Sequence, residues 1–133
     1  MLTIKRPLLN QMLNHLRECY PLEGCGLLAG DDQGRVTAVY PVKNILQSPT
    51  AYEMDPHQQI EAMVAIETEG WQLSAIFHSH PQGPEVPSAT DISLAFYPDT
   101  LTLIVSLVSL TKPVIRAFKI TGHNVTEQTV MVV

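Results

Sequence analysis

The strongest signal in this chain is the run Phe77-His78-Ser79-His80-Pro81-Gln82-Gly83-Pro84-Glu85-Val86-Pro87-Ser88-Ala89-Thr90-Asp91. It starts at the end of an apolar segment, residues 71–77, whose composition predicts a central strand. Side chains two residues apart on a strand leave the same face of the sheet. We therefore expect His78 and His80 to point together at one site, while Ser79 points away and hydrogen-bonds locally.

The residues after the histidines complete a candidate metal site. A loop of seven residues is stiffened by Pro81, Pro84 and Pro87. Ser88 then stands three residues before Asp91, so it can cap a helix whose first turn contains Asp91. A His-x-His pair alone is weak, since many such pairs bind no metal. Two imidazoles with one carboxylate suit zinc, and three protein ligands leave a fourth tetrahedral position open, as in catalytic sites.

This pattern of His78-Ser79-His80, seven residues, Ser88, two residues and Asp91 resembles the signature of the JAMM (MPN+) zinc metalloproteases. That family also carries a glutamate far upstream, in a strand that follows the first helix. The matching residue here is Glu23, within Pro21-Leu22-Glu23-Gly24-Cys25-Gly26-Leu27-Leu28-Ala29-Gly30, which resembles the family's segment. The order of elements also fits, so the resemblance covers nearly the whole chain.

The resemblance implies a site and a mechanism. One zinc ion per chain would be bound by His78, His80 and Asp91, and would polarise a substrate carbonyl and lower the pKa of its bound water to about 7. Glu23 would accept the proton of that water and deliver it to the departing amine. Ser88 would donate a hydrogen bond to the developing oxyanion, besides capping its helix.

The resemblance also implies a substrate class. JAMM enzymes cleave peptide or isopeptide bonds next to the C-terminal Gly-Gly of ubiquitin or ubiquitin-like proteins. This chain lacks the longer insertions that bind ubiquitin chains, and it resembles the small bacterial and archaeal members. The implied partner is a ubiquitin-like or sulfur-carrier protein. We expect its extended C-terminal tail to add as a strand beside an exposed sheet edge, with the scissile bond at the zinc.

Two other classes of function stay open. One is a zinc hydrolase or deaminase of a small molecule, although the deaminase signature of His-x-Glu with Pro-Cys-x-x-Cys is absent. The other is a non-catalytic MPN-type interaction module, but such relatives lack the metal ligands that this chain retains. Taken alone, Glu23 is described as well by an exposed acid near a helix end. Cys25 is a competing nucleophile, although a small thiol between two glycines is more often simply buried.

Length and composition bound the class of protein. A chain of 133 residues supports one core but not two, so we expect a single domain over residues 1–133. Hydrophobic residues make up 45% and charged residues 16%, which is typical of a folded protein. The net charge of −5, with only eight scattered Lys and Arg, argues against a nucleic-acid partner.

Location and redox state follow from the same residues. The longest apolar run, residues 101–110, is interrupted by polar residues and too short to span a bilayer. The first seven residues have no long apolar segment of a signal peptide. We therefore expect a cytoplasmic protein with no membrane partner. Cys19 and Cys25 form no Cys-x-x-Cys pair and are expected to be free thiols. The sequence leaves the oligomeric state open.

Hydrophobic periodicity indicates an α+β domain. Helices are expected from Pro7 to about Cys19, from N-cap Asp55 to Gly70, and from Ser88 or Thr90 to about Phe96. Strands are expected at residues 2–4, 27–30, 35–42, 51–54, 71–77, 101–109, 114–120 and 125–133. Helices and strands do not alternate strictly, which predicts a mixed, mostly antiparallel sheet flanked by helices. The JAMM resemblance implies the same architecture, a curved sheet in the cytidine-deaminase-like style.

Overall fold

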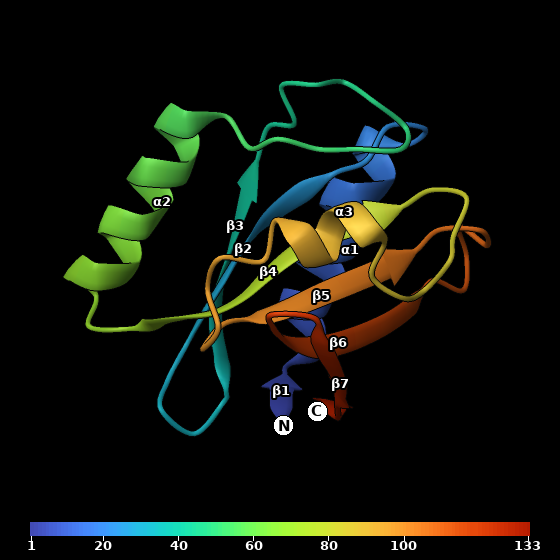
Figure 1. Ribbon diagram of the computed structural model, residues 1–133. Coiled ribbons are helices and arrows are strands. Elements are labelled where there is room, and N and C mark those ends of the chain that lie inside the picture. The colour runs from blue at the N-terminus through green and yellow to red at the C-terminus, as the bar shows by residue number, and fades with distance from the viewer.

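A computed structural model describes all 133 residues of the chain. Its elements are β1 (Leu2–Ile4), α1 (Arg6–Cys19), β2 (Cys25–Gly30), β3 (Val36–Val42), α2 (Pro56–Thr68), β4 (Gln72–His80), α3 (Ala89–Ser93), β5 (Leu101–Ser106), β6 (Val114–Thr121), β7 (Asn124–Gln128) and β8 (Val130–Val132). Six strands form one sheet in the order β3-β2-β4-β5-β6-β7, and only β4 and β5 in it are parallel. Figure 1 confirms the predicted α+β fold, a mixed sheet flanked by helices.

Helix α1 packs on one face of this sheet through the apolar stripe that its sequence predicts. Leu9, Met12, Leu13 and Leu16 recur at helical spacing and are all buried. They share one hydrophobic cluster with alternate residues of the central strands, among them Phe77 of β4. Burial of this stripe fixes α1 against the sheet. With 14 residues it is the longest helix, shorter than the roughly 20 residues that cross a bilayer, so none of the helices could span a membrane.

Helix α2 packs on the opposite face. Asp55 caps it, as predicted, by accepting a hydrogen bond of 3.1 Å from the main-chain N–H of Gln58. Its buried residues, Ala62 and Ile66, contact the residues of β2 that point away from α1, such as Leu27. Figure 1 shows α1 behind the strands and α2 apart from it on the other side. The central strands are therefore covered on both faces.

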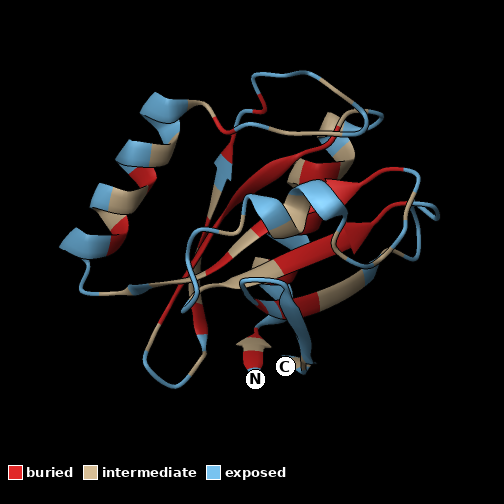
Figure 2. Cartoon of the chain, viewed as in Figure 1, coloured by how far each residue is buried: buried red, intermediate tan, exposed pale blue.

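Strand β5 shows this two-sided burial most clearly. Leu103 and Val105 belong to the cluster beneath α1, whereas Ile104 packs with Phe118 and Ile120 on the other face. The apolar run of β5 was predicted to be an interior strand for this reason, and the prediction is confirmed. Figure 2 shows the buried residues concentrated in the central strands, while the outer surface of α2 is exposed.

The C-terminal strand differs from the expectation. The predicted single strand over residues 125–133 is divided at Thr129 into β7 and β8. Strand β7 completes a hairpin with β6, but β8 leaves the sheet and pairs in parallel with β1, where Leu2 lies opposite Val130. The two ends of the chain consequently lie side by side (Figure 1). Pairing between the ends of a chain leaves no local signal in the sequence.

Two further elements end earlier than expected, and one predicted strand does not form. Helix α3 stops at Ser93, because none of its residues is buried and no core contact prolongs it. Strand β5 stops at Ser106, the residue opposite Val114, where its partner β6 begins. Residues 51–54 form no strand and contribute only an isolated bridge between Met54 and Asn44.

Gly26 offers a test of the packing of β2 on β4, where it is paired with Phe77. A Cβ atom at Gly26 would collide with the Phe77 ring and lie 2.5 Å from the carbonyl oxygen of Tyr40. We expect Gly26→Ala to lower the free energy of unfolding by about 1–3 kcal/mol, the usual cost of overpacking, in urea titrations. Asn14→Ala, at an exposed position of α1, should change it by less than about 0.5 kcal/mol. A Gly26→Ala protein as stable as the wild type would contradict this packing.

Candidate metal centre and catalytic site

The end of β4 presents His78 and His80 on one face of the sheet. Both are buried, and their Nε2 atoms lie 3.0 Å apart. Ser79 points to the other face, as predicted. Its hydroxyl accepts a hydrogen bond of 2.9 Å from the main-chain N–H of Gly24. The expectation of a local partner for Ser79 is wrong, because Gly24 lies in the segment that leads into β2.

The pairing of β2 with β4 brings Glu23 to the histidines. Cys25 lies opposite His78, and the Ser79 N–H donates to the Gly24 carbonyl at 3.0 Å, so the antiparallel register continues towards Glu23. Two residues before Cys25, Glu23 is directed to the same face. Ligand atoms of Glu23 and both histidines lie within 4.8 Å of one another. Only 4% of Glu23 is exposed, so the surface-acid alternative is wrong.

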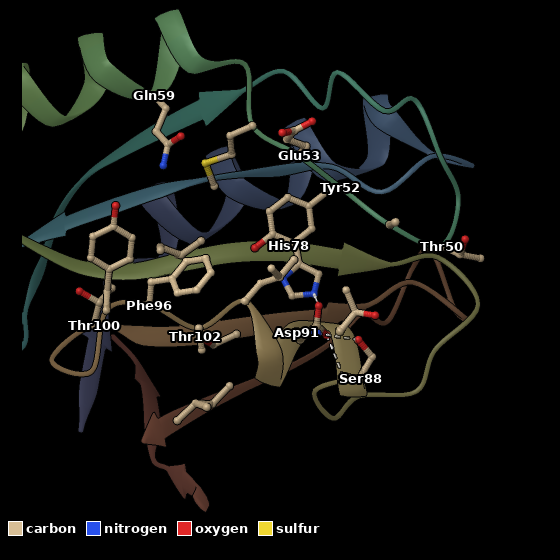
Figure 3. Close-up of a pocket in the computed structure, with 18 of the residues that line it drawn as sticks. Thr50, Tyr52, Glu53, Gln59, His78, Ser88, Asp91, Phe96, Thr100 and Thr102 are labelled. Carbon is tan, nitrogen blue, oxygen red and sulfur yellow. Dashed lines mark hydrogen bonds and ion pairs between the residues drawn. The ribbon is translucent and has the colours of Figure 1, made fainter. Parts of the chain in front are cut away.

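Asp91 reaches the histidines from the first turn of α3. Its Oδ1 lies 3.2 Å from Nε2 of His78, and its Oδ2 lies 3.1 Å from Nε2 of His80. Ser88 begins the helix: its Oγ accepts from the Asp91 N–H at 3.0 Å, while Asp91 Oδ2 accepts from the Ser88 N–H at 2.8 Å. This reciprocal capping box confirms the cap predicted from the spacing and orients the carboxylate (Figure 3).

The proline-rich loop sets the tautomer of His80. Nδ1 of His80 lies 2.7 Å from the carbonyl oxygen of Pro84. A carbonyl oxygen only accepts hydrogen bonds, so Nδ1 must carry the hydrogen and donate it. Without metal, Nε2 can also donate to Asp91 Oδ2 at 3.1 Å; once that proton leaves, the neutral imidazole presents the Nε2 lone pair towards the centre of the site. An outer hydrogen bond such as that of Nδ1 is typical of histidines that bind metals.

On its outer side, His78 is held by stacking rather than by a hydrogen bond at Nδ1. The ring of Tyr52 lies on it with centroids 4.6 Å apart and planes inclined by 29° (Figure 3). Nδ1 of His78 is buried and has no hydrogen-bond partner. Burial lowers the pKa of His78, which favours the neutral imidazole that metal binding requires.

The three donors fit a tetrahedral zinc ion. Bonds of 2.0–2.1 Å at tetrahedral angles separate ligand atoms by about 3.3 Å. The two Nε2 atoms are 3.0 Å apart, and each lies close to a different oxygen of Asp91, Oδ1 at 3.2 Å from His78 and Oδ2 at 3.1 Å from His80. Two imidazoles and a carboxylate are also ligand types that zinc prefers. The residues predicted from sequence, including Glu23 and Ser88, therefore come together in space.

The two carboxyl groups of the site have opposite electrostatic properties. Burial raises the pKa of Glu23 to about 7; the nearby His80 opposes this rise and Asp91 adds to it. Burial also acts to raise the pKa of Asp91, but hydrogen bonds with His78 and His80 outweigh it and hold that pKa well below its usual range. One carboxyl stays ionised, whereas the other can exchange a proton near neutral pH, a pattern common in catalytic sites.

A cavity of about 380 Å³ opens beside these residues. His78, Ser88 and Asp91 line it at the metal centre, and Tyr52 and Phe96 contribute aromatic side chains (Figure 3). Other apolar lining residues are Ala51, Met54, Ile76, Leu94, Ala95, Tyr97 and Ile120. No lysine or arginine lines the cavity, and the acidic residues that line it are Glu53 and Asp91, so it lacks cationic groups for an anionic ligand.

Two residues of the site were missed in the sequence. Tyr52, which stacks on His78, and Asn44, whose Nδ2 donates to the Glu23 carbonyl at 3.0 Å, both lie in the segment between β3 and α2. A strand was predicted only at residues 51–54 of that segment, and it pointed to no site, so only the polar and aromatic residues themselves were a signal. An asparagine just after a predicted strand is common in turns, which is why Asn44 attracted no assignment.

Cys25 is not the nucleophile of this site. Its side chain is fully buried, and its thiol donates to the Val42 carbonyl at 3.4 Å. Burial raises the pKa of Cys25 to about 12, which suppresses the thiolate. Cys19 and Cys25 are both free, as expected.

Comparisons with known proteins agree with this geometry. The family described as prokaryotic homologs of the JAB domain matches residues 5–121. The chain is 43% identical over 103 residues to a desampylase of Haloferax volcanii, covering 73% of this chain and 74% of the relative. It is 35% identical over 133 residues to the CysO-cysteine peptidase of Mycobacterium tuberculosis, covering 99% and 91%. A solution structure from Desulfitobacterium hafniense has a TM-score of 0.90 and 40% identity, covering 99% of this chain and 92% of that one.

Glu23 should give the metal-free protein a measurable pH dependence. Its pKa is about 7 in the folded protein, against an ordinary value of 4.5. The folded state therefore binds more protons between these values, and stability falls as pH rises through this window. We expect Glu23→Gln to stabilise the metal-free protein above about pH 7, by up to roughly 3 kcal/mol, and to have little effect below about pH 4.

Urea unfolding in the presence of a chelator, repeated across this pH range, measures the difference. Glu61→Gln removes an exposed acid from α2 and controls for the loss of one negative charge. The quantity compared is the change in the free energy of unfolding caused by Glu23→Gln. If this change stays constant with pH, or has the opposite sign above pH 7, burial does not destabilise the ionised Glu23 carboxylate.

Proposed function

The chain belongs to the family of prokaryotic homologs of the JAB domain, and from this premise we propose that it is a zinc metallopeptidase or isopeptidase. It hydrolyses the bond that follows the C-terminal Gly-Gly of a ubiquitin-like or sulfur-carrier protein. Relatives named desampylase and CysO-cysteine peptidase support this substrate class. The single observation that carries the proposal is the convergence of Glu23, His78, His80 and Asp91, of which His78 and Asp91 line the cavity.

His78, His80 and Asp91 are the zinc ligands in this proposal. The bound ion supplies a Lewis acid for the substrate carbonyl and makes water reactive near neutral pH. Two of these ligands are preorganised by hydrogen bonds: the Pro84 carbonyl orients His80, and the capping box with Ser88 orients Asp91. Little rearrangement is needed on binding, which favours metal affinity.

Glu23 moves the proton. As a carboxylate it accepts a proton from the water that attacks the scissile carbonyl carbon, and the resulting carboxylic acid then protonates the amine nitrogen as the C–N bond breaks. The water is consumed and the carboxylate is restored. A general base works best when its pKa lies near the working pH, and burial raises the pKa of Glu23 to about 7.

Ser88 stabilises the carbonyl oxygen. Its Oγ accepts from the Asp91 N–H, which leaves the hydroxyl hydrogen free to be donated. Ser88 also lines the cavity next to Asp91. The hydroxyl can therefore donate to the oxygen on which negative charge develops, an interaction that strengthens in the transition state.

The substrate tail enters through the cavity. The free edges of the six-stranded sheet are β3 and β7, whereas β4 is paired on both sides, with β2 and β5. Strand β4, which carries the histidines, therefore offers no free edge, and the expectation that the tail adds as a strand at an exposed sheet edge stays a prediction. In this proposal the tail lies between Tyr52 and Phe96, with its Gly-Gly next to Asp91. Glycines have no side chain, so their main chain can approach buried ligands closely.

Metal content and cleavage measured together test the proposal. We expect one zinc per chain in the wild type and in Glu23→Gln, because Glu23 is not a ligand, and little zinc in Asp91→Ala. Only the wild type should cleave a ubiquitin-like carrier extended beyond Gly-Gly at an appreciable rate, since the other two lack the base or the metal. Elemental analysis and mass spectrometry of the products provide the readouts.

The outcomes separate the remaining functions. Zinc without cleavage would favour a small-molecule substrate, and the absence of zinc from all three proteins would favour a non-catalytic module. Loss of zinc from Glu23→Gln would instead make Glu23 a ligand rather than the base. A carrier that ends in Ala-Ala controls for the need for glycine, and it should be cleaved poorly.

A serine pair on α3 tests the oxyanion contact. Ser88→Ala removes the hydroxyl donor, so we expect kcat to fall by about 10²–10³-fold with zinc retained. Ser93→Ala is the matched control, because Ser93 lies on the same helix and its hydroxyl donates only to the Thr90 carbonyl. Its kcat should stay within about twofold of the wild type. Equal activity of the two variants would remove Ser88 from the mechanism.

A further inference from the structure

The side-chain amide of Asn44, in the segment between β3 and α2, is saturated with main-chain partners. Its Nδ2 donates to the carbonyls of Glu23 and Ala51, each at 3.0 Å. Its Oδ1 accepts from the N–H groups of Leu46 at 3.0 Å and Glu53 at 3.1 Å. An asparagine side chain offers two donors and two lone pairs, so all of them are used. Asn44 is also buried, with 9% exposed.

These bonds join two parts of the site that are far apart in the sequence. The loop residues held by Asn44 are the ones on either side of Tyr52, whose ring stacks on His78. Of the other two bonds, one holds Leu46 in the same loop and one holds the main chain of Glu23. One amide thus connects the proposed base with the aromatic wall of the cavity.

Glu23 depends on this segment because it lies outside the sheet. Strand β2 begins only at Cys25. The Glu23 N–H donates to the Ser48 carbonyl at 2.9 Å, and the Glu23 carbonyl accepts from Asn44. Both main-chain polar groups of Glu23 are therefore bonded to residues 44–48. Without Asn44, the buried carbonyl of Glu23 would lose this partner.

We propose that Asn44 is a positioning residue that sets the Glu23 carboxylate against the metal centre and keeps Tyr52 over His78. The inference rests on the proposed function, because it assigns a role in the proton transfer by Glu23. Proton transfer needs hydrogen-bond geometry, and a displacement of about 1 Å can cost about 10²-fold in rate. Asn44 itself touches no substrate, and it contacts none of the three proposed ligands by hydrogen bonds.

Two substitutions separate the hydrogen bonds that Asn44 donates from those that it accepts. Asn44→Ala removes all four hydrogen bonds. Asn44→Asp keeps the acceptor for Leu46 and Glu53 but places an oxygen against the Glu23 and Ala51 carbonyls. We expect kcat on a ubiquitin-like conjugate to fall by about 10–100-fold in both variants. Zinc should remain at one per chain, because the ligands are held by other contacts.

A double substitution distinguishes positioning from general damage. If Asn44 acts through Glu23, adding Asn44→Ala to Glu23→Gln should lower the residual kcat by less than about threefold, since the base is already lost. A structural defect would lower it by the full factor seen in the wild-type background. That result would overturn the proposal.

Amide hydrogen exchange provides a readout that does not depend on activity. In Asn44→Ala the N–H groups of Leu46 and Glu53 should exchange at least about tenfold faster, whereas those of β4 should keep their wild-type protection. In Asn44→Asp the same two groups should stay protected, because the acceptor remains. Unchanged exchange at Leu46 and Glu53 in Asn44→Ala would contradict the hydrogen-bonding role.

Asp31→Ala is the matched control. Asp31 also holds a loop by accepting main-chain hydrogen bonds, from Gln33 at 2.9 Å and Arg35 at 3.0 Å, but at the opposite end of β2 from Glu23. It should retain wild-type kcat. Wild-type kcat in Asn44→Ala would overturn the proposal and leave the proposed function intact. Absence of cleavage by the wild type itself would refute the proposed function and this inference together.

Discussion

The antiparallel pairing of β2 with β4 is the constraint on which the rest of the site depends. Cys25 lies opposite His78, and two hydrogen bonds between Gly24 and Ser79 extend the pairing by one more residue. This register brings Glu23 next to the histidines. Because side chains alternate between the two faces, a shift of one residue would direct the carboxylate towards α1 and away from His78 and His80. Packing of α1 against the sheet holds the register.

The surroundings of Asp91 and Glu23 shift the pKa values of these two carboxyl groups in opposite directions. Asp91 has several hydrogen-bond partners, including His78 and the Ser88 N–H, which stabilise its charge despite burial. For Glu23 burial is the dominant effect, and it disfavours the charged form. The first environment suits a ligand that must stay ionised, and the second suits a base that must gain and lose a proton. The difference arises from neighbours, because the carboxyl groups themselves are alike.

Prediction from sequence succeeded wherever the relevant geometry spans a few residues. Three such features are each a property of one strand or one helix. They are the common face of His78 and His80, the capping box of Ser88 with Asp91, and the apolar stripe of α1. It failed at Asn44, which lies in a segment without periodicity and whose partners lie up to 21 residues away. It failed also at β8, whose partner β1 is at the other end of the chain.

The amino-acid sequence alone was sufficient to predict the common face of His78 and His80, the helix cap and the α+β class, because spacing along a single element already orients its side chains. The resemblance to a known family extends this to Glu23. The folded chain adds the proximity of Glu23 to the two histidines, the amide that holds the Glu23 main chain, and the cavity that opens beside His78 and Asp91. These features depend on strand register and loop closure, which are contacts between distant residues and have no local pattern.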